Sequence, residues 1–426
     1  MARKWLSDSL LLVALALLTA CGGNRSPQSW AERLQQEPAP DSIAFRYARL
    51  IHVERRDDCR IVYIDNPWNP GKTLHTYVLV PYAALNAQPL PSHQGEGLGG
   101  GSVNTLVRVP LQRSVVFTSV HCALIDQLQA TAQVAGVADL KYIKVPFVQE
   151  GVKRGTLIDC GDGMSPIVEK IIDASADAIL LSPFENSGGY GRLEDINIPI
   201  IECAEYMETS PLARAEWMRF YGMLYGKEKE ADSLFQEVET RYHALCQLAA
   251  VGGSPADTPS LEARSSALPG RPSVLMDKMA GSVWYVPGGR STIGQMLVDA
   301  GADYPWADDT NSGSLQLSFE TVLERAGHCQ LWLLRYDSPQ PLTLSALLSE
   351  KDGYRMMEAV KTPLPSRGGV GGGVIPAHGV YACNVSTSMF YEETPFRPDL
   401  LLQDFIKILH PDIQNLPPLR YYHRVE

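Results

Sequence analysis

The sequence lacks the features that define several large protein classes. No apolar run after the first 21 residues reaches the length needed to span a bilayer. The formal net charge is −11, which argues against binding to nucleic acid and against lying flat on anionic lipid. There is no Gly-x-Ser-x-Gly, no His-Glu-x-x-His and no paired catalytic carboxylate motif. We therefore predict a protein that is not an enzyme and has no cofactor.

Cysteine is sparse and scattered. The chain has 8 cysteines, with no Cys-x-x-Cys and no spacing typical of metal ligands. Cys21 belongs to the N-terminal segment, and most of the other seven lie in apolar contexts, as Cys203 does after Ile200 and Ile201. We predict buried thiols that pack as small hydrophobic side chains, with no protein-bound metal. Sequence alone leaves their pairing into disulfides open.

The N-terminal segment has the pattern of an export signal. Arg3 and Lys4 precede a short apolar run, which ends in Leu18-Thr19-Ala20-Cys21. A cysteine directly after Leu-Thr-Ala resembles the lipobox of bacterial lipoproteins, in which the cysteine is lipidated after cleavage. The alternative is a transmembrane helix with a chance cysteine, but the run is too short for about 30 Å of hydrocarbon. We expect an exported protein, lipid-anchored through Cys21 to a bacterial membrane and facing the periplasm.

Composition shifts divide the rest of the chain. The hydrophobic content of 45% is ordinary for a globular protein, and the length suggests more than one domain. The predicted boundaries are a signal peptide (1–20), a tether with an N-terminal β extension (21–104), an N-terminal α/β lobe (105–209), a connecting helix (210–250), a flexible loop (251–271) and a C-terminal α/β lobe (272–426).

Strand and helix patterns alternate in both predicted lobes. Short apolar runs at 115–117, 178–181 and 198–201, and later at 283–286 and 331–334, read as strands separated by helical segments. Apolar residues at helical spacing over 210–248 predict one long helix between the lobes. The fold class is therefore α/β, with two Rossmann-like lobes on mainly parallel sheets, a long backbone helix and an N-terminal β-hairpin extension.

Each lobe has a glutamate in the first turn of a comparable helix. Ser165-Pro166 is predicted to cap a helix over 167–174 that contains Glu169, and Ser318 to cap a helix that contains Glu320. A glutamate at this place stabilises the positive end of a helix. Helix capping alone would explain the positions of Glu169 and Glu320.

The order of these motifs resembles a known family, the periplasmic binding proteins of ABC importers for iron–siderophores, haem and cobalamin. The resemblance covers roughly residues 105–410, and its best local matches are 165–172 with 176–180, 225–231, 294–302 and 317–323. It implies an ABC permease and its ATPase as partners. It also gives Glu169 and Glu320 a second role, as the carboxylates that meet arginine pockets of the permease.

Ligands of such folds bind between the lobes, at loops that leave the carboxyl ends of strands. This rule nominates aromatic and polar residues on four loops: His121, Phe184, Glu185, Asn186, Tyr190, Tyr206, Trp284, Tyr285 and Arg290. For the loop at 184–191, a tight turn packed by its own aromatic rings is an equal alternative. His121 could ligate the metal of a bound chelate or simply pack at a helix start, and Arg290 could meet an anion or be solvated.

The predicted function is that of a monomeric, lipid-anchored substrate-binding protein. It would capture an iron chelate, either a siderophore or haem, in a cleft between the lobes and deliver it to the permease. Cobalamin or another corrinoid is the alternative cargo. A periplasmic α/β enzyme such as a chelatase-like protein, and a surface lipoprotein that works with an outer-membrane receptor, are the alternatives of other classes.

Overall fold

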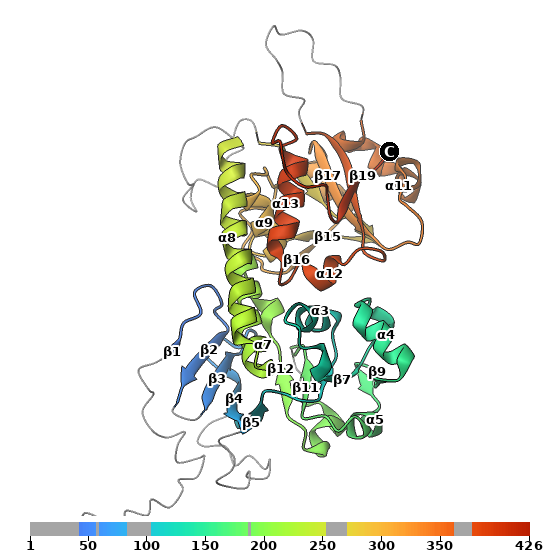
Figure 1. Cartoon of the computed structure of the whole chain (residues 1–426). Helices are drawn as coiled ribbons and strands as arrows, with labels where there is room; N and C mark the ends of the chain where they lie inside the picture. The colour runs from blue at the N-terminus through green and yellow to red at the C-terminus, as the bar shows by residue number, and fades with distance from the viewer. Residues whose placement is uncertain (1–41, 57–58, 83–103, 186–188, 253–270, 362–376) are drawn as a thin grey trace, which may run out of the picture.

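The computed structural model describes residues 42–56, 59–82, 104–185, 189–252, 271–361 and 377–426 (Figure 1). Two α/β lobes lie one above the other, and a long helix extends from one to the other. The predicted fold class is confirmed. Cys21 and Asn186 lie outside the described residues.

The N-terminal extension is a five-stranded sheet rather than the predicted hairpin. Its strands are listed in their spatial order: β1 (Ser42–Ile43), β2 (Ile51–Arg55), β3 (Arg60–Asp65), β4 (Thr73–Pro81) and β5 (Asn104–Val109). Only the β4–β5 pair is parallel. Side chains along β2 alternate between buried and exposed, with Ile51 and Val53 buried. This alternation is typical of a strand with one face on the core, and it places β2 in the sheet.

The N-terminal lobe has a five-stranded parallel sheet of order β12-β11-β6-β7-β8. Its strands are β6 (Ser114–Val116), β7 (Val134–Val137), β8 (Ile158–Asp159), β11 (Ala178–Leu181) and β12 (Ile200–Glu202). Its helices are α3 (Ser119–Gln127), α4 (Pro146–Arg154) and α5 (Val168–Asp173), with short turns η2 (Thr131–Gln133), η3 (Leu140–Tyr142), η4 (Gly191–Ile196) and η5 (Glu205–Met207). The strands after β6 fall first on one side of it and then on the other, so β6 and β11 flank a topological switch point.

The predicted cap at Ser165-Pro166 is wrong. These two residues form strand β10, which pairs with β9 (Gly161–Asp162), and α5 begins only at Val168 without a side-chain cap. The β9–β10 hairpin supplies hydrogen-bond partners for the backbone around Pro166. A Ser-Pro pair commonly starts a helix, but here it forms a short strand instead. Glu169 nevertheless lies in the first turn of α5.

The C-terminal lobe contains two sheets. The larger has the order β13-β17-β18-β19 and consists of β13 (Val274–Met276), β17 (Leu331–Tyr336), β18 (Gly379–Asn384) and the antiparallel edge strand β19 (Tyr422–Arg424). The smaller is antiparallel: β14 (Met279–Ala280), β15 (Val283–Pro287) and β16 (Ser314–Leu317). The predicted strand at 283–286 therefore belongs to a separate antiparallel sheet and not to a βα unit of the main one.

Five helices and two short turns complete this lobe. They are α9 (Thr292–Asp299), α10 (Phe319–Ala326), α11 (Leu344–Glu350), η7 (Asp352–Met356), η8 (Glu358–Val360), α12 (Phe390–Glu393) and α13 (Pro398–Leu409). Ser318 caps α10 as predicted, because its hydroxyl accepts a hydrogen bond from the Thr321 backbone N–H. Helix α13 lies beside the long helix, and α12 packs on α3 of the other lobe.

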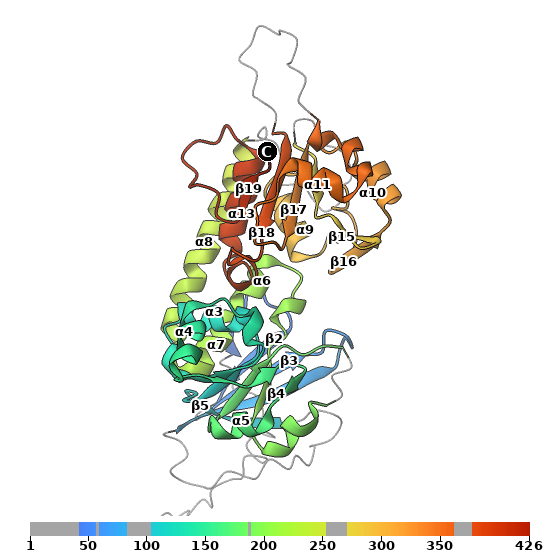
Figure 2. The same cartoon turned by 90° about the vertical axis from the view of Figure 1, so that its right-hand side faces the viewer.

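The single helix predicted over 210–248 is three helices. Helix α6 (Pro211–Glu216) leads into α7 (Met218–Tyr225), the chain turns at Gly226, and α8 (Glu228–Gly252) alone connects the lobes, as both views show (Figures 1 and 2). Gly226 has a φ of 65°, a left-handed conformation that favours glycine and ends α7. Helices α7 and α8 then pack against each other so closely that Gly222 faces Ala231.

Two buried carboxylates, one before α6 and one at its last residue, fasten the chain before β2 to this helix. Glu216 is fully buried and accepts hydrogen bonds from the backbone N–H groups of Arg46, Tyr47 and Ala48. Glu208 accepts two more from residues 49 and 50, and another from Trp217. The chain that leads into the N-terminal sheet is thereby fixed to α6 and the residues just before it.

The cysteines after the N-terminal segment are free thiols. Six of the seven are buried and Cys246 is half-buried. Burial raises the pKa of Cys160, to about 11, and the pKa of the other buried thiols Cys122, Cys203 and Cys329 likewise rises. This agrees with the prediction that they pack as small hydrophobic side chains.

Candidate functional site

A pocket of about 550 Å³ lies at the switch point of the N-terminal sheet; we call it the switch-point pocket. Phe117 and Thr118 follow β6, Asp139 follows β7, and Ser182 and Phe184 follow β11. The β9–β10 hairpin and residues 189–193 close the other sides. Loops at the carboxyl ends of parallel strands meet here, which is the general position of ligand sites in open α/β sheets.

The predicted loop at 184–191 contributes two aromatic residues to the switch-point pocket. Phe184 lines it with 46% of its surface exposed, so its ring is available to a ligand. Tyr190 also lines it, and its hydroxyl donates a hydrogen bond to Glu202 at 2.6 Å. Glu185 is exposed and is not among the lining residues. The Tyr190 part of this aromatic wall is thus held in place by the buried carboxylate of Glu202.

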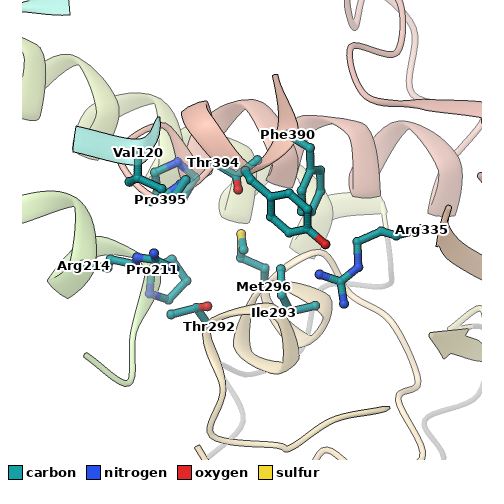
Figure 3. Close-up of a pocket in the computed structure, with 12 residues that line it drawn as sticks. Val120, Pro211, Arg214, Thr292, Ile293, Met296, Arg335, Phe390, Thr394 and Pro395 are labelled. Carbon is teal, nitrogen blue, oxygen red and sulfur yellow. The ribbon is translucent and has the colours of Figure 1, made fainter. Parts of the chain in front are cut away.

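A second pocket, of about 170 Å³, lies between the lobes; we call it the interlobe pocket (Figure 3). The N-terminal lobe contributes Val120 of α3, and α6 contributes Pro211 and Arg214. The C-terminal lobe contributes these residues: Thr292, Ile293, Met296, Arg335, Phe390, Tyr391, Thr394, Pro395 and Pro398. Val120 is two residues from Thr118, so both pockets adjoin the start of α3.

Two arginines face the interlobe pocket from opposite sides (Figure 3). Arg335 stands near the end of β17 and holds Asp277 through Nε at 2.8 Å and Nη2 at 2.5 Å. Burial alone would lower the pKa of Arg335, but the Asp277 carboxylate outweighs it and raises that pKa. Arg214 differs from Arg335, because its Nε is buried and has no hydrogen-bond partner among the described residues.

The prediction that His121 faces a ligand is wrong for this structure. Its side chain is fully buried, and Nε2 lies 3.1 Å from a carboxylate oxygen of Glu205, which is also buried. The Tyr221 ring lies against it, with centroids 5.4 Å apart. The first turn of α3 directs this side chain into the core. The structure therefore agrees with the alternative that His121 packs at a helix start.

Trp284 is likewise a core residue and not a cleft residue. It is fully buried, its Nε1 donates to the Met276 carbonyl at 2.9 Å, and its ring packs on Trp332 and Phe319. In β15, alternate residues point to opposite faces, so Tyr285 is exposed where Trp284 is buried.

The remaining predicted cleft residues line neither pocket. Tyr285 and Arg290 are exposed. Tyr206 is half-buried and donates its hydroxyl to the Pro183 carbonyl at 2.5 Å, and burial followed by the nearby Glu205 raises its pKa to about 12. Tyr206 therefore holds the loop after β11 in place.

The two glutamates predicted to meet the permease are exposed at the first turns of α5 and α10. Arg192 pairs with Glu169 at 2.7 Å and lowers the pKa of that carboxyl. The pKa of Glu320 is lowered by its own backbone N–H and by the Ser318 hydroxyl. Both side chains are ionised and face solvent.

Sequence reasoning missed Arg214 and Arg335. A signal existed for Arg335, because an arginine within the apolar strand Leu331–Tyr336 must find a partner or face a cavity. Arg214 follows Pro211 on a short helix and has no distinguishing pattern in the sequence.

No helix in the described ranges is long and apolar enough to cross a membrane. Over the same ranges, His, Cys, Asp and Glu side chains form no group of three or more that could hold a metal ion.

The sequence model of the periplasmic binding protein family matches residues 115–363, which is more than half of the chain. The chain therefore belongs to the periplasmic binding protein family, whose members serve ABC transport.

Individual relatives are distant. An uncharacterised lipoprotein of Methanocaldococcus jannaschii is 24% identical over 334 residues, covering 76% of this chain and 70% of its own length. A periplasmic haem-binding protein from Pseudomonas aeruginosa is 14% identical with a TM-score of 0.50, over 74% of this chain and 98% of that one. The molybdate-binding protein MolA of Haemophilus influenzae is 17% identical with a TM-score of 0.50, over 71% and 87%. These structural similarities concern the fold.

Proposed function

We propose that this protein is a lipid-anchored substrate-binding protein that captures an iron chelate, either a ferric siderophore or haem, and delivers it to an ABC permease. One observation carries the choice of cargo: the switch-point pocket has an aromatic wall around Phe184 and a volume of about 550 Å³. Sites for small organic ligands have volumes of this order and are lined mainly by apolar and aromatic side chains with a few polar groups.

The polar groups of the pocket suit an organic chelate better than a bare ion. Thr118, Ser182 and Asp139 line it beside the aromatic residues, so hydroxyl groups and a carboxylate face the same space as the rings. Arg192 also lines it, paired with Glu169 at 2.7 Å. A chelate presents an apolar or flat ligand surface to the rings and its polar edges to these groups. A bare metal ion would instead need several His, Cys or carboxylate ligands together.

Lipid anchoring at Cys21 rests on the sequence pattern around this residue and is consistent with the lipoprotein relative. Tethering a binding protein to the membrane raises its effective concentration at the permease, which favours delivery at low cargo levels. Metabolic labelling of the full chain with a radioactive fatty acid tests this assignment. Wild type should incorporate label and Cys21→Ala should not.

Binding of the cargo is tested with the purified full chain. We expect tryptophan fluorescence to change on titration with haem or with a ferric hydroxamate siderophore, and cyanocobalamin to have a smaller effect. Phe184→Ala should weaken the binding about tenfold, since burying an aromatic side chain contributes roughly 1.5–3 kcal/mol. Ile172→Ala is the matched control, because Ile172 is 52% exposed on the same lobe and lies outside the pocket.

The comparison of the three ligands decides the cargo. Tight binding of cyanocobalamin with no response to either iron chelate would reassign the protein to corrinoid capture. Equal binding by wild type and Phe184→Ala would move the site away from the switch-point pocket.

A further inference from the structure

A histidine of the N-terminal sheet contacts the N-terminal lobe. Strand β4 contains His75, whose Nδ1 lies 3.0 Å from a carboxylate oxygen of Glu202, the last residue of β12. These two residues are 127 positions apart in the chain, and their strands lie in neighbouring sheets (Figure 1). The family model begins at residue 115 and does not include β4. The contact therefore involves a part of the molecule that the family model does not describe.

Glu202 is the middle of a hydrogen-bonded chain that ends in the switch-point pocket. Its side chain is 8% exposed, and its two oxygens bind different partners: Oε2 binds His75, and Oε1 accepts the Tyr190 hydroxyl at 2.6 Å. A carboxylate only accepts hydrogen bonds, so the Nδ1 of His75 carries the proton and donates. Because the Tyr190 ring lines the pocket, this chain connects the N-terminal sheet to the pocket wall.

His75 is itself held in one orientation. Its Nε2 lies 2.7 Å from the Thr105 hydroxyl on β5, and its ring stacks on Tyr77 with centroids 4.3 Å apart. Tyr77 is fully buried, and its hydroxyl accepts the Glu202 backbone N–H at 2.8 Å and donates to the Ile200 carbonyl at 3.1 Å. Strand β4 thus fixes both the backbone and the side chain at the end of β12, which is the support that a binding residue needs from its neighbours.

Tyr190 gains order from this support. It is a half-buried loop residue, whose hydroxyl donates to Glu202 and whose backbone N–H donates to Glu194, each at 2.6 Å. A ring that is already fixed does not have to be ordered when a ligand binds, and this favours affinity. Removing the His75 donor leaves one oxygen of a buried carboxylate unpaired, so we expect Glu202 to shift and the Tyr190 hydroxyl to follow it.

We propose that His75 is a positioning residue for cargo binding, which holds the Glu202 carboxylate and through it fixes the Tyr190 ring in the wall of the switch-point pocket. This inference deepens the proposed function and rests on it, because an effect on affinity requires that this pocket binds the chelate. The described residues that line the pocket all follow β5 in the chain. The N-terminal sheet therefore acts on recognition through its hydrogen bonds and not by touching the cargo.

The test is a double-mutant cycle on the purified full chain, titrated with haem and with a ferric trihydroxamate and followed by tryptophan fluorescence. His75→Phe keeps a ring against Tyr77 and removes the donor, whereas Tyr190→Phe keeps the pocket ring and removes its hydroxyl. Each should weaken binding about threefold to tenfold, which corresponds to the cost of ordering one side chain. The double variant should bind no more weakly than the weaker single variant, because both substitutions break the same chain.

Two further substitutions at His75 separate positioning from general stability. His75→Asn places an amide donor near the position of Nδ1, where it can reach Glu202, and should recover part of the affinity. His75→Gln places its amide near Nε2, keeps a partner for Thr105 and should weaken binding as His75→Phe does, so it replaces that variant should His75→Phe fail to fold. Thermal unfolding midpoints report on folding of every variant.

His52→Phe is the matched control. His52 lies on β2 of the same sheet and also pairs with a carboxylate, Asp65 at 3.0 Å, but its side chain is 58% exposed. Its replacement should leave the affinity for both chelates unchanged.

The position of the Tyr190 ring can also be followed without cargo. 3-Fluorotyrosine incorporated at position 190 gives a single fluorine NMR signal that responds to the surroundings of the ring. His75→Phe should shift this signal, His75→Asn should shift it less, and His52→Phe should leave it in place.

These measurements distinguish failure of the inference from failure of the proposed function. If Phe184→Ala weakens chelate binding but His75→Phe changes it by less than about twofold, the inference is overturned and the proposed function stands. Equal weakening by His75→Phe in the wild-type and Tyr190→Phe backgrounds also overturns it, because His75 would then act by another route. If neither chelate binds wild type, the proposed function fails. A shift of the fluorine signal in His75→Phe would then still support the positioning of Tyr190, and an unchanged signal would overturn it.

Discussion

At the scale of single residues, Glu216 fixes the N-terminal sheet to the body of the protein. Its buried carboxylate accepts three backbone N–H groups and contacts Arg219 at 3.3 Å. Glu216→Ala leaves one buried and two partly buried donors without an acceptor, so we expect a loss of about 3 kcal/mol in the free energy of unfolding. Urea denaturation followed by circular dichroism measures it.

The control for this prediction is Glu150→Ala. Glu150 is exposed on α4 and pairs with Arg154 at 3.7 Å, so its loss should change stability by less than about 0.5 kcal/mol. Similar effects of the two substitutions would show that the Glu216 contacts contribute little.

Residue types could be predicted from the sequence more easily than their burial. Phe184 and Tyr190 were found because an aromatic, glycine-rich loop follows an apolar strand. His121 and Trp284 have the same residue chemistry, but the local rotation of α3 and the alternation of β15 direct them into the core. Arg214 depends on the way α6 meets the opposite lobe, which no local pattern records.

At the scale of elements, the turn at Gly226 decides which helix connects the lobes. A Cβ added at Gly226 would lie 3.0 Å from the Cβ of Pro110, and its φ is left-handed. We expect Gly226→Ala to destabilise the fold by about 2 kcal/mol or more, since the strain alone costs about 1–2 kcal/mol. Thermal or urea unfolding provides the measurement.

Gly155→Ala separates backbone strain from crowding. Gly155 ends α4 with a φ of 73°, and an added Cβ there meets nothing within 4 Å. Gly155→Ala should therefore lower the free energy of unfolding only by the cost of the left-handed backbone strain, about 1–2 kcal/mol. Equal losses at the two positions would mean that the contact with Pro110 relaxes without cost.

Elements with strong periodicity were predictable, but their ends and partners were less so. The helical pattern of residues 210–248 was real, yet a left-handed glycine inside it reverses the chain, and periodicity does not distinguish a bend from a reversal. The strand at 283–286 was found as a strand, but its antiparallel partners, β14 and β16, lie in short, weakly patterned segments.

At the scale of the whole molecule, two ionised glutamates on different lobes offer a docking geometry for a permease. Glu169 and Glu320 are exposed, and their carboxyl pKa values are lowered, so both remain charged at neutral pH. Two separated carboxylates can seat a bilobed protein in one orientation against arginine pockets, as we infer for this chain.

We expect Glu169→Ala combined with Glu320→Ala to abolish uptake of a radiolabelled iron chelate in cells that depend on this protein. Chelate binding in solution should stay intact, because Arg192, which pairs with Glu169, still lines the switch-point pocket. The matched control is Glu150→Ala with Asp412→Ala, which removes one exposed carboxylate from each lobe outside α5 and α10. Uptake by the single variants should be reduced but measurable, because each lobe retains one contact. A parallel loss of chelate binding in the double variant would place these glutamates in folding or cargo capture, and normal uptake would rule out their docking role.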